Sequence, residues 1–288
     1  MPGHTRPGRL LVGTSGYAYP HWRGPFYPAD LPRGEWLRFY ATRFPTVELN
    51  NPFYRLPEPR AFRAWQAAVP PGFVFAVKAS RFLTHVKRLS EPDAPLRRFL
   101  SRARHLGDRL GPVLFQLSGT FHLDLARLDG FLRALARQRL VPGLRAVLEV
   151  RHASWLDRAA TERLCAAGVA LGLADWPELP VAGPLTADFV YLRRHGTAGR
   201  YAGSYGREAL RDDARRIRGW LRDGRDVFAY FNNDAEAHAA RDARRLVELC
   251  GAGPPSPGGP IRARARDDLA QGSPTGVTRT RAGGPASS

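Results

Sequence analysis

Hydrophobic residues along the chain alternate between short continuous runs and longer stretches with helical spacing. Eight runs have the composition of buried strands: Leu10–Val12, Thr46–Leu49, Phe73–Ala79, Val113–Leu117, Ala146–Val150, Val169–Ala174, Phe189–Arg193 and Val227–Phe231. Seven stretches repeat apolar residues at intervals of three and four: Glu35–Phe44, Pro59–Ala68, Ala94–Leu110, Asp124–Gln138, Asp157–Ala167, Glu208–Arg222 and Ala235–Leu249. The link from the sixth run to the seventh, Pro177 to Asp188, is too short and proline-rich for a full helix.

This alternation of strands and helices predicts parallel βαβ units in an α/β fold. Several runs are almost continuously apolar, as expected for strands covered on both faces. Eight such strands favour a single closed (β/α)8 barrel of the TIM type over an open doubly wound sheet. The sequence VGTSGYAY after the first run lacks the G-x-G-x-x-G pattern of a dinucleotide site.

The chain of 288 residues is expected to form one domain. We expect a flexible amino terminus over residues 1–9, the barrel over residues 10–250, and a disordered tail rich in Gly, Pro and Arg over residues 251–288. No secretory segment or membrane span is recognisable. Cys165 and Cys250 suggest neither a disulfide framework nor a metal cluster, so we expect a cytoplasmic protein.

Polar residues gather at the carboxyl ends of the predicted strands. Since side chains of a strand alternate between faces, residues two apart point the same way. Seven of the eight runs end on one face in polar groups: Glu48 and Asn50, Lys78, Gln116, Glu149 and Arg151, Asp175, Arg193 and His195, and Asn232. The first run ends in small residues that include Ser15. In a (β/α)8 barrel these groups would surround the mouth where active sites lie.

Two interpretations of this ring remain open on the sequence alone. It can be a salt-bridge network, because buried charges persist only when they are paired. It can also be a pocket for an anionic or polyhydroxylated ligand, since arginine binds phosphate and carboxylate through its forked donors. In that pocket Glu48, Lys78, Glu149 and His195 are the catalytic candidates, because a carboxylate beside an imidazole or amine can transfer protons.

The sequence gives weaker support to two other kinds of chemistry, metal binding and Schiff-base formation. His85, Glu149, Asp175 and His195 are suitable ligand types for a divalent metal. No H-x-x-x-H or C-x-x-C spacing supports such a site, so we assign no metal ligands and leave the cofactor open. Lys78 in an apolar strand could form a Schiff base. Pairing of Lys78 with Glu48 would explain the same residue more simply.

The segment GYAYPHWRGPFYP, residues 16–28, is too aromatic for a solvated connection. It either caps the barrel as a hydrophobic cluster or forms a stacking wall for a planar or sugar-like ligand. Asn51-Pro52 is primarily a turn signal.

The formal net charge of +18 raises affinity for polyanions. Only two of the 44 basic residues are lysines, Lys78 and Lys87. Charge alone does not identify a nucleic-acid-binding protein, because no recognition motif accompanies it.

Seven ordered blocks resemble the YecE-like proteins, domain of unknown function 72: VGTSGYAYPHWRGPFYP, VELNNPFYRLP, FAVKASRFLTH, GPVLFQL, VLEVRHASW, VYLRRHG and YFNND. The resemblance covers about Leu10 to Leu249 and implies a TIM-like barrel of unestablished activity. It implies site roles for Ser15, Trp22, Glu48, Asn50, Tyr54, Lys78, His85, Gln116, Glu149, Arg151, His152, Trp155, Arg193, His195, Asn232 and Asn233. The chain departs from the family at Asn51-Pro52, usually Ser-Thr, at Ser118-Gly119, usually Pro-Pro, and at Asp242, usually Asn.

The sequence is therefore compatible with three functions. The first is an enzyme, a hydrolase or isomerase, that acts at the barrel mouth on a phosphorylated, sugar-like or nucleotide-like substrate. The second is a nucleic-acid-binding protein with or without nuclease activity, supported by the charge of the chain. The third is a non-catalytic sensor of an anionic small molecule. Neither a membrane partner nor an oligomeric state is indicated by the sequence.

Overall fold

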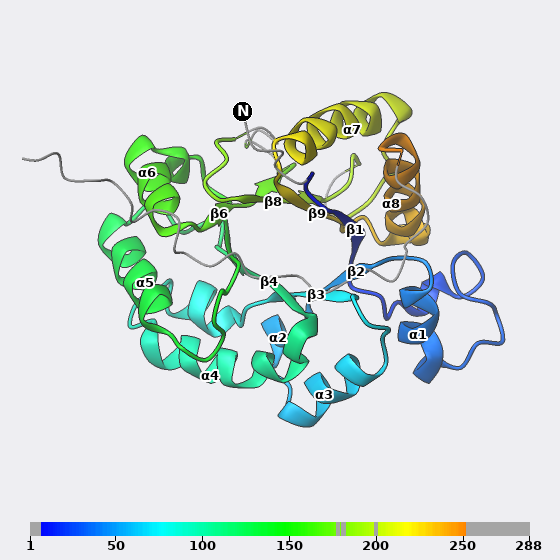
Figure 1. The fold of residues 1–288 in the computed structure, drawn as a ribbon, viewed down its shortest axis with the longest axis horizontal. Helices are drawn as coiled ribbons and strands as arrows, with labels where there is room; N and C mark the ends of the chain where they lie inside the picture. Colours follow the sequence, from blue (N-terminus) through cyan, green and yellow to red (C-terminus); the bar gives the residue numbers. More distant parts are fainter. Residues whose placement is uncertain (1–6, 177–178, 180–182, 199–200, 252–288) are drawn as a thin grey trace, which may run out of the picture.

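The computed structural model describes residues 7–176, 179, 183–198 and 201–251, and one parallel sheet forms its centre (Figure 1). The strands are β1 (Leu10–Ser15), β2 (Thr46–Leu49), β3 (Val74–Lys78), β4 (Leu110–Gln116), β5 (Ala146–Glu149), β6 (Ala170–Leu171), β7 (Leu173–Ala174), β8 (Phe189–Arg194) and β9 (Asp226–Phe231). Their order in the sheet is β6-β5-β4-β3-β2-β1-β9-β8-β7. Because β6 and β7 are consecutive in the chain, the two edges of the sheet meet. The predicted TIM-like barrel is thereby confirmed.

Gly172 is where the barrel closes. The sixth predicted run is broken at this residue into β6, which pairs with β5, and β7, which pairs with β8. The Gly172 amide donates to the Leu148 carbonyl at 2.9 Å, so β5 is still bonded across the break. A Cβ at Gly172 would lie 3.2 Å from Cβ of Glu149. The absent side chain therefore leaves room for Glu149 inside the barrel.

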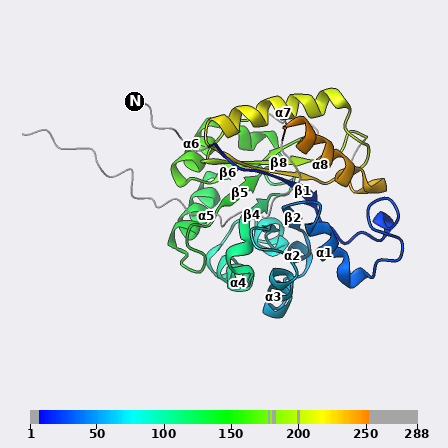
Figure 2. The same ribbon diagram turned by 45° about the vertical axis from the view of Figure 1, so that its right-hand side comes forward.

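Helices surround the strands on all sides of the barrel (Figures 1 and 2). They are α1 (Trp36–Ala41), α3 (Pro59–Ala67), α4 (Asp93–Ala103), α5 (Leu125–Arg137), α6 (Arg158–Ala167), α7 (Arg207–Arg222) and α8 (His238–Leu249). The predicted helix Ala94–Leu110 is too long, because α4 ends at Ala103 and a 3-10 segment, η4 (Arg104–Arg109), follows. Gly107 within that segment has φ 56°, which a continuous helix does not accommodate.

Short helical turns were not predicted and follow five strands at their carboxyl ends. They are η1 (Pro20–Trp22), α2 (Asn51–Tyr54), η3 (Phe82–Val86, a π-helix), η5 (Ala153–Leu156) and η6 (Ala235–Ala237). A further 3-10 turn, η2 (Arg33–Glu35), precedes α1. From β1 to β9 the strands follow one another clockwise in Figure 1. Because βαβ crossovers are right-handed, this order means that the amino ends of the strands point toward the reader. The carboxyl ends and their turns lie on the far side.

Two buried clusters separate the inside of the barrel from the layer beneath the helices. The inner cluster contains Leu11, Val74, Ala76, Leu114, Val147, Ala170, Ala187, Phe189, Tyr191, Phe228 and Tyr230. The larger outer cluster joins the opposite faces of the strands to the helices. By strand alternation, Lys78, Gln116, Glu149, Arg193 and Asn232 continue the inner cluster toward the carboxyl ends.

Parts of three predicted segments lie outside the described residues: 1–6 of the amino terminus, 252–288 of the tail, and 177–178 and 180–182 of the irregular link. Residues before β1 that are described contact the barrel. The Gly8 amide donates to the Leu221 carbonyl at 2.9 Å, and the Arg9 amide donates to Asp226 Oδ1 at 2.9 Å. Within the described part of the chain, no helix has the length and apolarity needed to cross a membrane.

Candidate active site

Arg193 is the centre of an ionic network inside the barrel, and its side chain is buried. Its Nη2 donates to Glu48 Oε1 at 2.8 Å and to Ser15 Oγ at 3.1 Å. Its Nη1 donates to Glu149 Oε2 at 2.8 Å. One guanidinium thus joins carboxylates from β2 and β5. The sequence prediction that these strand ends face one another is confirmed by the geometry, and this part of the ring is a salt-bridge network.

Glu48 is fully engaged by neighbours. Besides Arg193, its Oε1 accepts from Ser15, and its Oε2 accepts from the Tyr191 hydroxyl at 2.6 Å. Asn50 donates through Nδ2 to Ser15 Oγ at 3.1 Å. A buried carboxylate with these partners has no free oxygen for proton transfer. We therefore place Glu48, a predicted catalytic residue, in a positioning role.

Arg151 and His195 form a second layer above this network. Arg151 makes an ion pair with Glu149 and its Nη2 lies 3.0 Å from His195 Nε2. Arginine only donates, so His195 Nε2 accepts in this contact. The other ring nitrogen, Nδ1, lies 3.1 Å from Asn232 Nδ2. Burial, together with Arg193, holds the pKa of His195 well below its usual value.

Arg151 retains buried hydrogen-bonding capacity. Its side chain is 4% exposed and its guanidinium lies 3.7 Å from the centre of the Trp176 ring. Both Nε and Nη1 are buried without a hydrogen-bond partner among the described residues. An unmade hydrogen bond at a buried charged group costs on the order of 1–3 kcal/mol. Each of these donors, on a different edge of the guanidinium, could bind an oxygen of an anionic ligand.

Lys78 lies at the carboxyl end of β3 without an ion pair to any described carboxylate. Its Nζ is 4.0 Å from the centre of the Phe53 ring. The pairing with Glu48 predicted from sequence is wrong, because Glu48 is already bound by Ser15, Tyr191 and Arg193. Burial, reinforced by the charge of Arg193, lowers the pKa of Lys78 to about 8.

His85 lies beside Phe53 as well, with ring centroids 5.0 Å apart. Its Nδ1 contacts Thr84 Oγ1 at 2.9 Å. Burial and the positive charge of Lys78 lower the pKa of His85 to about 4, so the imidazole is neutral at physiological pH. Gln116 donates through its side-chain amide to the Leu117 carbonyl. Both residues border the ring as predicted and leave its charge unchanged.

The opposing charges also set the protonation of the network. Burial alone would raise the pKa of Glu149, but Arg151 and Arg193 lower it below the ordinary value. Burial would lower the pKa of Arg193, and Glu149 and Glu48 raise it instead. Glu149 and Arg193 are therefore both charged. Protonated Lys78 adds a positive charge that has no ion-pair partner among the described carboxylates, which favours an anion.

Acid should destabilise the chain through Glu149. A lowered pKa in the folded state contributes stability that is fully present above the unfolded value of about 4.5 and is lost as pH falls. We expect the pH dependence of the free energy of unfolding between about pH 5 and 3 to become shallower in Glu149→Gln. Urea unfolding at several pH values measures this. Glu162→Gln, at a side chain 61% exposed, is the control and should leave the slope unchanged; equal slopes for all three proteins contradict the assignment.

Asp175 does not join the ring, which corrects the sequence prediction. Gly172 faces the inside of the barrel, whereas Leu171 and Leu173 belong to the outer cluster. Asp175 consequently faces outward. Its Oδ1 accepts from the backbone amide of His195 at 2.6 Å, and its Oδ2 accepts from the Tyr205 hydroxyl. Asp175 holds the backbone of the site instead of lining it.

Asn233 lies behind the site and is fully buried. Its Nδ2 donates to the Gly203 carbonyl and to Asp242 Oδ2, both at 2.8 Å. Asp242 also accepts from Ser204 Oγ at 2.7 Å and from the Tyr205 amide at 3.0 Å. These bonds tie the loop after β8 to α8. The Asp at position 242 therefore serves as a loop anchor that accepts three hydrogen bonds.

The aromatic segment after β1 is a packed cluster, so the alternative of a stacking wall is not supported. Trp22 and Tyr27 are fully buried, and Tyr27 stacks on Trp36 with centroids 4.7 Å apart. Trp22 Nε1 donates to the Asp234 carbonyl at 2.8 Å. Trp155 is likewise buried and donates to the Phe121 carbonyl at 2.6 Å. Both tryptophans, predicted to bind ligand, hold loops together.

His152 caps the turn η5 and lies outside the ionic network. Its Nδ1 accepts from the Ser154 amide at 3.2 Å, and its ring contacts that of His122 with centroids 3.8 Å apart. Among the described residues, no three His, Cys, Asp or Glu side chains are placed to hold a metal ion. Of the ligand types considered from sequence, His195 lies 3.9 Å from Glu149 Oε1 through Nε2 and donates its backbone amide to Asp175, whereas His85 contacts Thr84 and Phe53.

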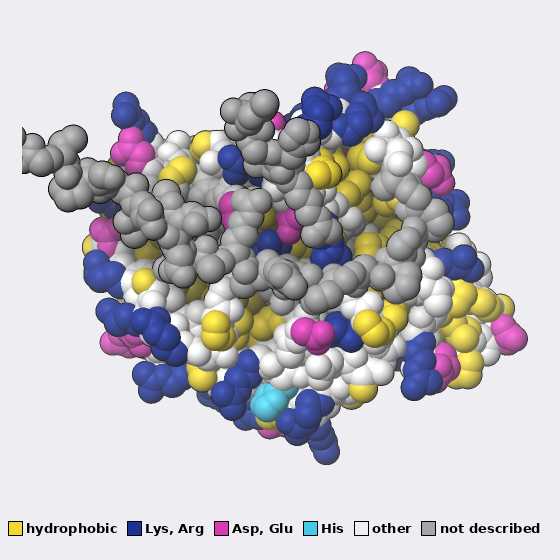
Figure 3. All heavy atoms as spheres, viewed as in Figure 1, with side chains coloured by type: hydrophobic (Ala, Val, Ile, Leu, Met, Phe, Trp, Pro, Cys, Tyr) yellow, Lys and Arg dark blue, Asp and Glu magenta, His cyan; other side chains and the backbone are white. Residues whose placement is uncertain are grey.

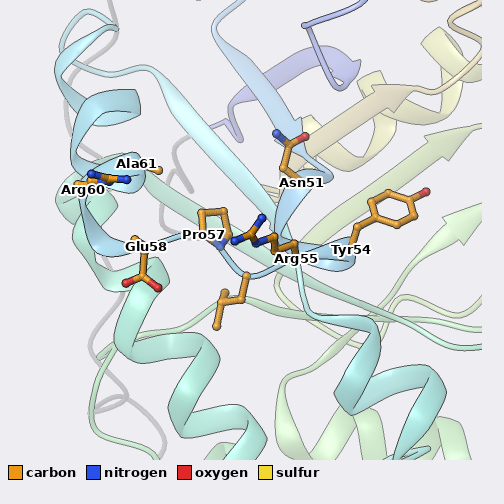
Figure 4. A pocket seen from close by; sticks show the side chains of 8 residues that line it. Asn51, Tyr54, Arg55, Pro57, Glu58, Arg60 and Ala61 are labelled. Carbon is orange, nitrogen blue, oxygen red and sulfur yellow. The ribbon is translucent and has the colours of Figure 1, made fainter.

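A separate cavity of about 550 Å³ lies beside the mouth between α2 and α3 (Figure 4). Its lining consists of Asn51, Tyr54, Arg55, Leu56, Pro57, Glu58, Arg60 and Ala61. Tyr54 extends away from Glu58 and Arg60 in Figure 4, and it is 74% exposed. Of the predicted site residues, Tyr54 is the one that borders this cavity. The charged network is not part of its lining.

Two residues of the site were missed on the sequence. Tyr191 binds Glu48, and its position two residues before Arg193 on the same strand was a usable signal. Trp176 stacks on Arg151. It follows Asp175 directly, but its approach to Arg151 depends on barrel closure.

Comparison with known proteins identifies relatives with this barrel. Residues 11–263 match the family model described as "Protein of unknown function DUF72". The chain belongs to the DUF72 family. It is 25% identical over 254 residues to UPF0759 protein YunF of Bacillus subtilis strain 168, covering 77% of this chain and 89% of YunF.

Two solved DUF72 structures resemble this chain. A protein from Thermotoga maritima MSB8 is 28% identical with a TM-score of 0.74, covering 84% of this chain and 99% of that one. A protein from Enterococcus faecalis V583 is 18% identical with a TM-score of 0.71, covering 85% and 96%. The DUF72 fold is therefore a TIM-like barrel in this chain, and the family description assigns it no activity.

Proposed function

We propose that this DUF72 barrel is an enzyme, a hydrolase or isomerase, that binds a small anionic substrate at the carboxyl ends of its strands. The observation that carries the proposal is Arg151, whose Nε and Nη1 are buried without partners among the described residues. An oxygen of a phosphate or carboxylate would satisfy either of these donors in a charge-assisted hydrogen bond. Substrates of the phosphorylated, sugar-like or nucleotide-like classes carry such groups.

The network beneath Arg151 would hold this contact in place. Glu149 bridges Arg151 and Arg193, so the guanidinium that meets the ligand is oriented by a carboxylate that is itself fixed. Trp176 stacks against the face of Arg151. Preorganised donors of this kind bind an anion without the cost of reorienting at each binding event. Lys78 and His195 flank the same mouth and would supply the reactive groups.

Thermal unfolding with matched ligand pairs tests the proposal. Sugars and their phosphates, and carboxylates and their amides, are added at equal concentration and ionic strength. We expect only anionic members to raise the Tm, because a ligand at about 100 times its Kd stabilises the folded state by about 2.7 kcal/mol. Turnover of a stabilising ligand then separates an enzyme from a ligand sensor. Equal shifts from charged and neutral members would refute anion recognition.

A nucleic-acid partner is the second candidate, favoured by two exposed aromatic side chains near basic ones. Tyr54 in α2 is 74% exposed and Phe82 in η3 is 48% exposed, and Arg55 and Arg81 adjoin them in the chain. Exposed rings beside cations suit stacking of unpaired bases. On the face of the barrel that Figure 3 shows, basic side chains occur around the outline and are interspersed with acidic ones.

A single-stranded oligonucleotide in the same experiment distinguishes the two candidates. If nucleic acid is the ligand, its affinity should fall steeply with salt and should fall further in Tyr54→Ala/Phe82→Ala. If the mouth binds a small anion, that double substitution should leave the small-molecule Tm shift unchanged.

A further inference from the structure

Lys78 is a half-buried amine at the mouth of the barrel that lies against an aromatic ring. It follows Ala76 on the inner face of β3, and its Nζ lies 4.0 Å from the centre of the Phe53 ring. The two buried carboxylates of the site, Glu48 and Glu149, are bound by arginines. Within the described part of the chain, no carboxylate lies within ion-pair distance of Lys78. The usual explanation of a buried lysine, a neutralising partner, therefore does not apply.

The other lysine of the chain provides a contrast. Lys87 forms an ion pair with Glu91, with Nζ 2.8 Å from Oε2, on the loop that follows η3. Burial and Arg193 lower the pKa of Lys78 to about 8, so roughly a tenth of its amine is unprotonated at pH 7. An amine with the ordinary lysine pKa is unprotonated in well under about a thousandth of molecules. Lys78 is thus placed and protonated for nucleophilic attack.

The charged groups around Lys78 come from several elements and do not all act in one direction. Arg193 of β8 and Arg151 after β5 favour the neutral amine, whereas Glu149 of β5 and Glu48 of β2 oppose them. His85 of η3 is also within electrostatic reach and is neutral at physiological pH. Because the carboxylates are each paired with an arginine, their effect on Lys78 is largely cancelled and burial decides the balance.

We propose that Lys78 forms an imine with a carbonyl compound whose anionic group is held by Arg151. This inference rests on the function proposed above and narrows its substrate to an anionic aldehyde or ketone, such as a 2-oxo acid or a phosphorylated carbonyl sugar. The two side chains supply complementary parts of that recognition. Arg151 offers two unpaired donors to the anion, and Lys78 offers an unpaired amine to the carbonyl carbon.

The reaction is balanced without an oxidant or cofactor. The lone pair of the neutral Lys78 amine forms a bond to the carbonyl carbon as the C=O π bond breaks, an amine proton moves to the carbonyl oxygen, and a carbinolamine results. A second proton, taken from solvent, lets that oxygen leave as water and gives the protonated imine, which withdraws electrons from the neighbouring carbon. Such an intermediate assists removal of a proton beside the carbonyl, and water later regenerates the free amine. Of the two reaction classes proposed, this chemistry favours an isomerase over a hydrolase.

Reductive trapping with two matched aldehydes tests the inference on the intact chain. Glyoxylate carries a carboxylate, and acetaldehyde has the same number of carbons without charge. Cyanoborohydride reduces any imine to a stable secondary amine, and peptide mapping locates it. Since the chain has only two lysines, Lys78 and Lys87, the readout is unambiguous once the terminal amine is mapped separately.

We expect glyoxylate to modify Lys78 at least roughly tenfold faster than Lys87, with a rate that rises through a midpoint near pH 8. With acetaldehyde, the rate of modification of Lys78 should exceed that of Lys87 by a smaller factor. Lys78→Arg should lose the modification, whereas Lys87→Arg, the matched control, should retain it. Arg151→Met should slow glyoxylate more than acetaldehyde, because loss of the Arg151 charge raises the pKa of Lys78 for both aldehydes but removes anion recognition for glyoxylate alone.

Different failures have different meanings. If Lys78 reacts no faster than Lys87 while anions still raise the Tm, the imine is refuted and the proposed anion site stands. If neither modification nor an anion-dependent Tm shift occurs, both proposals fall. Equal modification by the two aldehydes, unchanged in Arg151→Met, would leave a reactive amine but overturn recognition of an anionic carbonyl compound.

Discussion

Arg193→Met should destabilise the chain by about 3–5 kcal/mol, because it removes the cation shared by two buried carboxylates and leaves Glu48 without an ion pair and Glu149 with Arg151 alone. Glu48 and Glu149 are fully buried and both bind Arg193 at 2.8 Å. Methionine fills much of the volume of the arginine stem, so the loss reports on charge more than on a cavity. Urea unfolding at neutral pH measures the difference.

Arg158→Met is the control for that substitution. Arg158 pairs with Glu162 at 2.6 Å, but the two side chains are 91% and 61% exposed. An exposed pair of this kind contributes at most about 0.5 kcal/mol. Similar small losses for both variants would show that the buried network does not stabilise the barrel. Because Glu48 also binds Ser15 and Tyr191, part of the network can survive in the Arg193 variant, and the lower end of the range would then be observed.

Arg151→Met should have the opposite profile, with a large effect on ligand binding and a small one on stability. Removing one partner of a buried, hydrogen-bonded charge pair costs about 2–5 kcal/mol of binding, on the order of 100-fold in Kd. Glu149 keeps its contact with Arg193, so the free energy of unfolding should change by no more than about 1–2 kcal/mol. Calorimetric titration with the best anion from the Tm screen measures the first quantity, and urea unfolding measures the second.

Arg145→Met is the matched control for Arg151. Arg145 also forms a partly buried ion pair, with Asp226 at 2.8 Å, but Asp226 is the first residue of β9 and thus at the amino end of the barrel. The Arg145→Met variant should have a lower free energy of unfolding and an unchanged affinity for the anion. A large loss of stability in Arg151→Met with unchanged binding would mean that Arg151 is only part of the salt-bridge network.

The geometry reconciles the two interpretations that the sequence left open. The lower layer, Glu48, Arg193 and Glu149, is joined by ion pairs, and of the Arg193 nitrogens Nε alone is buried without a hydrogen-bond partner among the described residues. The upper layer, Arg151 with Lys78 and His195, retains unpaired donors and an unpaired amine. A residue such as Glu149 belongs to both, because one oxygen binds Arg193 and the other meets Arg151.

The sequence predicted the strands and, for most of them, which residues share a face. Continuous apolar runs predict strands covered on both faces, and those runs appear as strands in the order expected. Period-two alternation placed Glu149 and Arg193 on one face with Val147 and Tyr191, and the inner cluster contains both of those residues. These features are local, since they depend on neighbouring residues of one strand.

Asp175 shows where local pattern fails. In a strand that is apolar on both faces, alternation groups residues but does not say which group is inside. The sequence prediction placed Asp175 in the ring, and with it the residues two and four before it, Leu173 and Leu171; yet Gly172 faces the barrel interior and the leucines face the helices. The small residue is required there because Glu149 occupies the space.

Lys78 shows a second limit, since partner choice among charges is set by three-dimensional distance. Glu48 was available to Lys78 on the sequence, but barrel closure brings β8 beside β9 and directs Arg193 across the interior to Glu48. The guanidinium of Arg193 then pairs with both Glu48 and Glu149, and the amine of Lys78 has no ion-pair partner among the described residues. Likewise, Trp22 and Trp155 resemble ligand-binding residues until their indole donors are seen to bind backbone carbonyls.

The sequence by itself determined an α/β barrel of the DUF72 type and the set of strand ends that meet at its mouth, because periodicity and composition act locally along each strand. The tertiary structure decided which of those residues neutralise one another and which keep free hydrogen-bonding capacity. That division depends on closure at Gly172, which brings residues more than a hundred positions apart within about 3 Å and so fixes the pairing of buried charges.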